Sequence, residues 1–187
     1  MGKDAALGHA GLRQTAVRHL TAMGDPAEIY DDLAQFIDAA ADAGNEAVLL
    51  DALNLTDQVE PLCDDAYASL VRYARSNAWD ALRYIRRTPQ NVWSWEQPEL
   101  VQQIYWLRAS VQHPGHTKLP RHYRAQIRCN LGNALSGAGR FVDALAEWRM
   151  ALAEQPELGM AHGNMGEGLL TYARALYDNG HAVLFLQ

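Results

Sequence analysis

Three histidines lie close together in the sequence, at His113, His116 and His122. Imidazole is a common zinc ligand, so this group is the first candidate for a metal site. No carboxylate or cysteine, the usual additional ligands, stands close to them in the sequence. Pro114 and Gly115 separate the first two histidines and are typical of a turn. We therefore predict a turn in this segment and no metal ion.

Local signatures of nucleophilic catalysis are also missing from the sequence. There is no glycine-flanked serine elbow, no phosphate-binding loop and no convincing pair of cysteine and histidine. The acidic pairs Asp31-Asp32 and Asp64-Asp65 are adjacent residues, which point to different sides of a helix. They are better explained as charges in first helical turns, where the helix dipole favours negative groups. No catalytic residue and no cofactor are predicted.

The clearest pattern lies between Ala125 and Pro156, AQIRCNLGNALSGAGRFVDALAEWRMALAEQP. Two helical patterns of similar length are separated by Ser-Gly-Ala-Gly at residues 136–139. The small residues Gly132 and Ala144 would let the two helices approach closely. Trp148 would fill the gap toward a following helix. Pro156 would end the second helix, because its ring cannot continue the hydrogen-bond ladder.

The pattern begins again after Pro156, at an offset of thirty-four residues. The first set is matched by the second in the pairs Asn130 and Asn164, Leu131 and Met165, Gly132 and Gly166, and Leu135 and Leu169. The match then fails, because Asp178 and Ala182 stand where an alanine and an aromatic residue are expected. The second helix of this unit is either replaced by one longer helix or lies beyond the chain.

In this register the stretch resembles the tetratricopeptide repeat (TPR), a helix–turn–helix unit that stacks into a superhelix. The packing positions that carry the resemblance are Leu131, Gly132, Ala144, Trp148, Ala151, Pro156 and, in the second unit, Gly166. The resemblance implies that the first helix of each unit lines a groove for a protein or peptide partner. The groove residues it implies are Gln126, Asn130, Asn133, Asn164 and Glu167.

Asn130 and Asn164 occupy the same position in successive units. Two amides one repeat apart could hydrogen-bond the backbone of an extended peptide without reading its side chains. Alternatively, each amide satisfies a neighbouring helix end or water. A lysine at the position of Cys129 would have suggested capture of a carboxy-terminus, so this clamp is not expected.

Upstream of the repeat, helical periodicity predicts antiparallel helices joined by short turns. The predicted helices are 10–23, 26–44, 45–59, 61–75, 78–87 and 98–112, with a break at Ser76-Asn77. Residues 1–9 are predicted to be frayed or disordered, and residues 88–98 to form an irregular loop. Strand-like alternation is absent from the sequence. The predicted fold is all-α, a TPR-like superhelix of roughly eight or nine helices, with a degenerate repeat region at 10–120 and the regular unit at 121–187.

Composition narrows the class of function. A net charge of −6 over 187 residues argues against a general nucleic-acid binder, which needs clustered cations. The apolar runs are too short to cross a membrane, and the first residues lack the apolar core of a signal peptide. Only two cysteines occur, at Cys63 and Cys129, which fits a reducing, cytoplasmic setting. A soluble cytoplasmic protein is predicted.

A second resemblance covers Arg121 to Leu186, mainly through GRFVDALAEWRMALAEQPELGMAHGNMG and YARALYDNGHAVLFL. It is to the helical-repeat region that precedes a HEPN domain in a bacterial family. HEPN ribonucleases use an Arg and a His separated by four to six other residues, and Arg13–His19, Arg108–His113 and Arg174–His181 have this spacing. Chance supplies such pairs in an arginine-rich chain. The resemblance places the nuclease domain after residue 187, which would also explain the uncapped apolar end HAVLFLQ; this tail could instead dock as a cap.

The sequence therefore leads first to a non-catalytic scaffold that binds a protein or peptide partner. The alternative is the sensor or regulatory half of a HEPN-type RNA-targeting system in stress or phage defence. Direct RNA cleavage by this chain ranks third. Nucleic-acid binding through this segment alone and membrane association are not expected, and homo-oligomer formation is left open.

Overall fold

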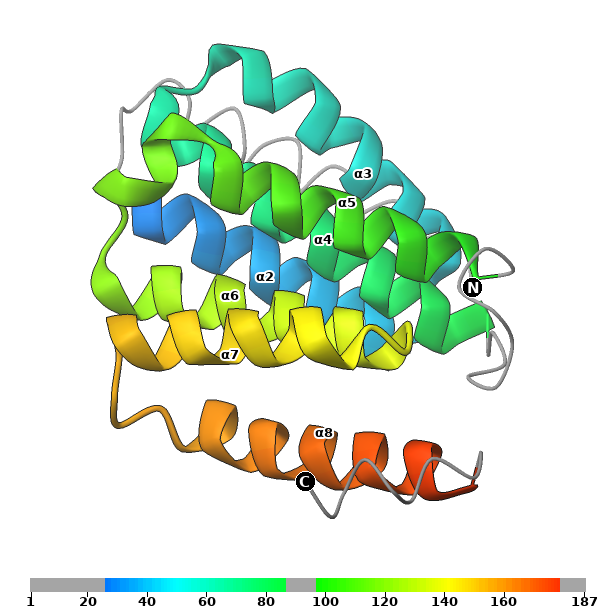
Figure 1. Cartoon of the computed structure of the whole chain (residues 1–187). Coiled ribbons are helices and arrows are strands. Elements are labelled where there is room, and N and C mark those ends of the chain that lie inside the picture. Colours follow the sequence, from blue (N-terminus) through cyan, green and yellow to red (C-terminus); the bar gives the residue numbers. More distant parts are fainter. Residues whose placement is uncertain (1–25, 87–96, 179–187) are drawn as a thin grey trace. The chain divides into compact units, whose positions relative to one another are not determined.

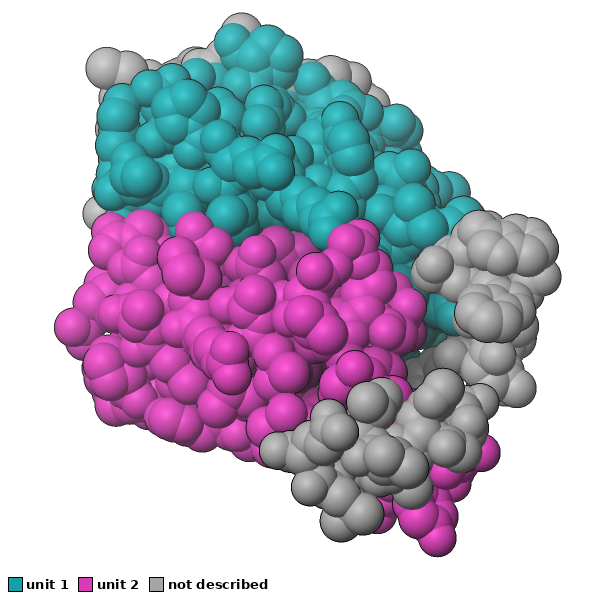
Figure 2. All heavy atoms as spheres, in the orientation of Figure 1, with its two compact units in different colours: residues 1–119 teal, residues 120–187 magenta. Residues whose placement is uncertain are grey.

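The computed structural model describes residues 26–86 and 97–178 (Figure 1). The described α-helices are α2 (Pro26–Asp42), α3 (Glu46–Val59), α4 (Asp65–Arg86), α5 (Pro98–Gln112), α6 (Arg121–Gly137), α7 (Phe141–Glu154) and α8 (Gly159–Asp178), with 3-10 turns η1 (Glu60–Leu62) and η3 (Pro114–Lys118). Every regular element in these ranges is helical, which confirms the all-α class. The predicted helix at 10–23 and most of the predicted loop at 88–98 lie outside the described residues. The chain forms two compact units, Met1–Leu119 and Pro120–Gln187, coloured separately in Figure 2.

Helix α4 is the centre of the first unit, and α2, α3 and α5 all pack against it (Figure 1). Because neighbours pack on several of its faces, its buried residues are spread around the helix rather than along one stripe. Tyr73 is 1% exposed and stacks on Tyr30 of α2, with ring centroids 5.0 Å apart. Ser69 of α4 and Ser110 of α5 exchange hydrogen bonds between each hydroxyl and the other residue's carbonyl, at 3.1 and 2.8 Å. These small residues allow the two helices to approach closely.

The predicted break at Ser76-Asn77 is wrong, because α4 continues from Asp65 to Arg86 without interruption. Both side chains are satisfied inside the unit instead of bending the backbone. The Ser76 hydroxyl donates to the carbonyl of Tyr73 at 2.6 Å, which is a bond that a helix tolerates. The amide of Asn77 donates to the Tyr30 hydroxyl at 3.2 Å. Two polar residues that are typical of turns are therefore accommodated in a continuous helix, Ser76 by its own backbone and Asn77 by a residue of α2.

The start of α4 also differs from the expectation that Pro61 opens it. Pro61 lies in the 3-10 turn η1, and α4 begins after Asp64. The carboxylate of Asp64 accepts hydrogen bonds from the backbone N–H groups of Ala66 and Tyr67, each at 3.0 Å. This is N-capping, which satisfies donors that the first turn leaves free. The backbone at Gly115 in η3 lies so close to the same helix end that a Cβ there would overlap the Asp65 carbonyl.

The second unit is the hairpin of α6 and α7 followed by α8, which runs beside α7 (Figure 1). Gly139, in the turn of the hairpin, has φ of +75°, a conformation that glycine adopts without strain. The indole of Trp148 is 2% exposed and lies between two glycines. A Cβ added to Gly132 of α6 would lie 2.5 Å from its Nε1, and one added to Gly168 of α8 would lie 2.5 Å from its Cζ3.

The other expected packing positions are placed as follows. Leu131, Ala144 and Ala151 are buried at 1% exposure or less. Pro156 is exposed and follows the end of α7 at Glu154. Gly166 is exposed, and a Cβ there would meet nothing within 4 Å. Gly168, which was not predicted, is the α8 glycine that packs on Trp148.

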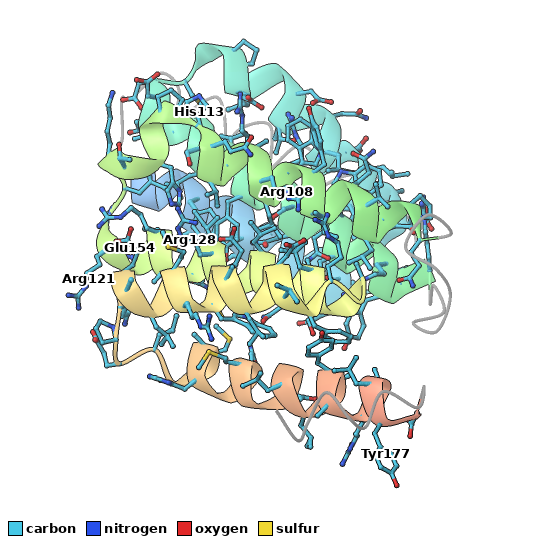
Figure 3. The ribbon with its side chains drawn as sticks, in the orientation of Figure 1. Arg108, His113, Arg121, Arg128, Glu154 and Tyr177 are labelled. Carbon is cyan, nitrogen blue, oxygen red and sulfur yellow. The ribbon has the colours of Figure 1, made fainter. Side chains whose placement is uncertain are left out.

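Three ion pairs join arginines of α6 to the second helix of the hairpin and the segment after it. Arg124 pairs with Glu154 at 2.7 Å, Arg128 with Glu147 at 2.9 Å, and Arg121 with Glu157 at 2.8 Å. Arg121, Arg128 and Glu154 are labelled in Figure 3. Each such surface pair contributes at most about 1 kcal/mol. Their main effect is to neutralise the cationic segment that the sequence places between residues 121 and 128.

Candidate functional site

A pocket of about 220 Å³ opens between α6 and α8 of the second unit, over the edge of Trp148. Polar side chains provide most of its lining. Its residues are Asn133, Ser136, Trp148, Asn164, Glu167, Gly168 and Thr171. Helical spacing explains the arrangement, because residues three and four apart lie on the same face. Asn133 and Ser136 thus share one face of α6, while Asn164, Glu167, Gly168 and Thr171 come from successive turns of α8.

A chain of hydrogen bonds starts from the buried indole and ends in the pocket. Trp148 Nε1 donates to Asn133 Oδ1 at 2.9 Å. Asn164 Nδ2 donates to the same oxygen at 2.7 Å. The amide nitrogen of Asn164 also lies 3.8 Å from the Cys129 sulfur. The two asparagines that meet are therefore Asn133 and Asn164, one on each helix.

The tryptophan fixes which way round both amides lie. An indole N–H can only donate, so the Asn133 atom beside it must be the carbonyl oxygen. That oxygen can then accept a second bond only from a donor, which must be the NH₂ of Asn164. Asn133 Nδ2 and Asn164 Oδ1 are left without a partner among the residues that the structure describes. The pair thus offers one donor and one acceptor to a ligand.

Among the described residues that line this pocket, Glu167 is the only ionisable one. The other acidic residues of the α6–α7 hairpin and its exit are paired with arginines: Asp143 with Arg140, Glu147 with Arg128, Glu154 with Arg124 and Glu157 with Arg121. No cation within the described ranges pairs with Glu167. Ser136 and Thr171 add hydroxyl groups, which can donate or accept. The pocket is therefore polar and carries one negative charge.

The predicted groove residues divide into two groups. Asn133, Asn164 and Glu167 line the pocket. Gln126 and Asn130 are half-buried and lie on the same face of α6 as Asn133, further toward the start of the helix. Asn130 does not line the pocket beside Asn164, and the bond that Asn164 makes goes to Asn133. The amide of Asn164 thus bonds a side chain of α6, which is neither of the two partners that the sequence suggested.

Cys129 lies under the pocket and is fully buried. Burial raises the pKa of its thiol, an effect that the amide of Asn164 partly opposes. A neutral, buried thiol carries no positive charge with which to bind a carboxylate. The role of Cys129 here is to support the side chain of Asn164.

The first unit has a separate hollow of about 430 Å³ around the start of α4. Its lining residues are Asp57, Glu60, Pro61, Cys63, Asp65, Ala68, Arg72, Arg75 and His113. Arg75 is 4% exposed and pairs with Asp57 at 2.6 Å and Glu60 at 3.1 Å. Its guanidinium also lies over the Trp106 ring, 4.0 Å from the centroid. Arg72 pairs with Glu60 at 2.7 Å.

These charges neutralise one another, which explains how the hollow tolerates a buried guanidinium. Burial lowers the pKa of Arg75, while Asp57 and Glu60 oppose that shift. Asp65 at the rim pairs with Lys118 at 2.7 Å. Because the arginines and carboxylates of this hollow are paired with one another, they offer a ligand few free charges. We therefore regard it as structural support for the α3–α4 corner.

His113 belongs both to the histidine group considered for a metal site and to one of the Arg–His pairs. His113 Nδ1 accepts a hydrogen bond from Gly115 N at 3.1 Å within the turn at η3. Arg108 is the arginine paired with it by spacing, and the two are labelled on α5 and at its end in Figure 3. The other two Arg–His pairs include residues outside the described ranges. In the described parts of the chain, no group of three or more His, Cys, Asp or Glu is placed to hold a metal ion.

Comparisons with known proteins leave the chain to be interpreted from its own structure. No family model, no curated protein and no solved structure matches it. Among the helices that the structure describes, none is both long and apolar enough to span a membrane.

Proposed function

We propose that this chain is a helical-repeat scaffold that binds an extended peptide segment of a partner in the groove between α6 and α8. The observation that carries the proposal is the polar pocket of the second unit, where both helices contribute side chains with free hydrogen-bonding groups. A free donor on Asn133 and a free acceptor on Asn164 match the N–H and C=O groups of an extended backbone. We also propose that residues 121–187 belong to a TPR-like superhelix.

The packing of the second unit supports the assignment to a TPR-like superhelix. Small residues at Gly132, Ala144 and Ala151 lie in the contact region, and Trp148 reaches the following helix at Gly168. In a stacked repeat, first helices from successive units line one groove. Here α6 and α8 would be two such helices.

Peptide titration of the full chain tests the proposal. We would add an N-acetylated, C-amidated octapeptide pool of degenerate sequence to the ¹⁵N-labelled protein and follow its amide resonances. The expected result is a shift of resonances from α6 and α8, including those around Asn133 and Asn164. The double variant Asn133→Ala/Asn164→Ala, which removes the free donor and the free acceptor, should weaken binding about tenfold or more, the equivalent of about 1.4 kcal/mol.

Val142→Ala is the matched control, because this side chain is 67% exposed on α7 and does not line the pocket. It should bind the pool as the unmodified chain does. The proposal fails if no resonance of α6 or α8 responds to the peptides. It also fails if the double variant and the control bind equally well.

A further inference from the structure

The pocket between α6 and α8 has features that select one class of ligand group. Its volume of about 220 Å³ is below the range of about 300–1,000 Å³ that holds a drug-sized molecule. A single side chain of a larger partner is a better match in size. The open question is which side chain its chemistry favours.

From this pocket we infer that the bound peptide inserts a lysine or arginine side chain, with Glu167 as its counter-charge. This inference rests on the proposed function and adds the specificity of its site. Glu167 is the one ionisable group in the lining, and the described part of the chain supplies no cation to pair with it. An incoming ammonium or guanidinium group would gain a charge-assisted hydrogen bond there.

The remaining lining groups also favour a ligand that donates hydrogen bonds. Asn164 presents Oδ1, because its NH₂ is committed to Asn133. Ser136 and Thr171 present hydroxyl oxygens that can accept. A lysine ammonium has three donors and an arginine guanidinium has five, so either can use several of these acceptors at once. A carboxylate ligand would instead meet the negative charge of Glu167.

Trp148 fixes the orientation of the acceptor on Asn164. Its Nε1 donates to Asn133 at 2.9 Å, which holds the Asn133 oxygen in place and thereby the NH₂ of Asn164 against it. The indole cannot shift easily, because Gly132 and Gly168 bring backbone close to its two edges. The acceptor on Asn164 is therefore oriented before any ligand arrives. Such preorganisation reduces the ordering cost of binding.

The test uses four octapeptide pools that differ only in one fixed central residue: arginine, lysine, citrulline or norleucine. Citrulline has nearly the shape of arginine without its charge, and norleucine lacks the ammonium group of lysine. Binding to the full chain would be measured by fluorescence anisotropy at low and high salt. The arginine and lysine pools should bind at least about tenfold more tightly than the neutral pools, and the difference should shrink as salt rises.

Glu167→Gln is the deciding variant, because it retains a side chain of similar shape and removes the charge. It should bind arginine and citrulline pools with equal affinity. Asp143→Asn is its control, since Asp143 is paired with Arg140 and does not line the pocket. This control should retain the preference for arginine.

The outcomes separate the inference from the proposed function. If all four pools bind equally to the unmodified chain, the cation specificity is overturned while peptide binding stands. The specificity is also overturned if Glu167→Gln retains the full preference for arginine. If no pool binds, both the proposed function and the specificity fail.

Discussion

The confinement of Trp148 can be measured with two alanine substitutions on one helix. Gly166 and Gly168 both lie within α8, so replacing either by alanine brings the same gain in helix propensity, about 0.8–1 kcal/mol. At Gly166 a Cβ would meet nothing within 4 Å. At Gly168 it would lie 2.5 Å from Cζ3 and 2.6 Å from Cη2 of Trp148. The steric cost should be that of overpacking a core, about 1–3 kcal/mol.

The two substitutions should therefore differ in their effect on stability. Gly166→Ala should stabilise the chain by about 0.5–1 kcal/mol, the usual gain at an unstrained site. Gly168→Ala should fall below Gly166→Ala by the overpacking cost, about 1–3 kcal/mol, since the propensity gain cancels between them. The indole has no simple escape, because a Cβ at Gly132 would lie 2.5 Å from its other edge, so that edge is also closely covered.

Urea unfolding followed by circular dichroism would give the free energies of unfolding. Hydrogen exchange of peptides from α6, α7 and α8 would show whether the change lies in the second unit. A Gly168→Ala variant as stable as Gly166→Ala would refute the reasoning. In that case Trp148 must be free to move, and it could not orient the asparagines of the pocket.

Two further predictions concern the first unit. Gly115→Ala should destabilise it by at least about 2 kcal/mol in thermal unfolding, because the added Cβ would overlap the Asp65 backbone carbonyl; an unchanged midpoint would contradict this, and exposed Thr117→Ala serves as control. Burial, with Asp64 and Glu60 adding to it, raises the pKa of Cys63 from 9.0 to about 11. Since the thiolate is the reactive form, iodoacetamide should label Cys63 about a hundredfold more slowly at pH 8 than in denaturant. The rate in the folded chain should keep rising with pH and level off only near pH 11, the pKa of the folded thiol. Equal rates in the folded and denatured chain would contradict this.

Helical periodicity was a good guide to the elements that have one buried stripe. It predicts a helix at 98–112, and α5 spans Pro98–Gln112. It also predicts a helix at 45–59, and α3 spans Glu46–Val59 with Asn45 as its N-cap, since Asn45 Oδ1 accepts from Val48 N at 3.2 Å. The method fails on α4, which is surrounded by neighbours. There Ser76 and Asn77 look like a turn in the sequence. Ser76 instead bonds a backbone carbonyl of its own helix, and Asn77 bonds Tyr30, which only the folded unit brings beside it.

The sequence predicts several residues that line the candidate site, but it does not predict which of them bond one another. The repeat register selects Asn133, Asn164 and Glu167, all of which line the pocket. It does not show that Asn133 and Asn164 meet each other, because that depends on the distance between two helices. Gly168 was missed although a signal exists: Ala161, Gly168 and Ala175 recur every seven residues and mark one small-residue seam on α8. The role of these residues in binding stays a prediction.

The packing of the Trp148 indole between two glycines also limits which substitutions the protein can accept during evolution. A larger residue at Gly132 or Gly168 is expected to be harmful while Trp148 is present, and a smaller residue at Trp148 is expected to leave a void beside both glycines. Each single step is then unfavourable, whereas a paired exchange of volume could be neutral. The three positions should therefore vary together among relatives, and their substitution effects should be strongly non-additive. Loss of the tryptophan would also remove the N–H donor that orients Asn133 and Asn164. A substitution in the core would therefore change the pocket between α6 and α8.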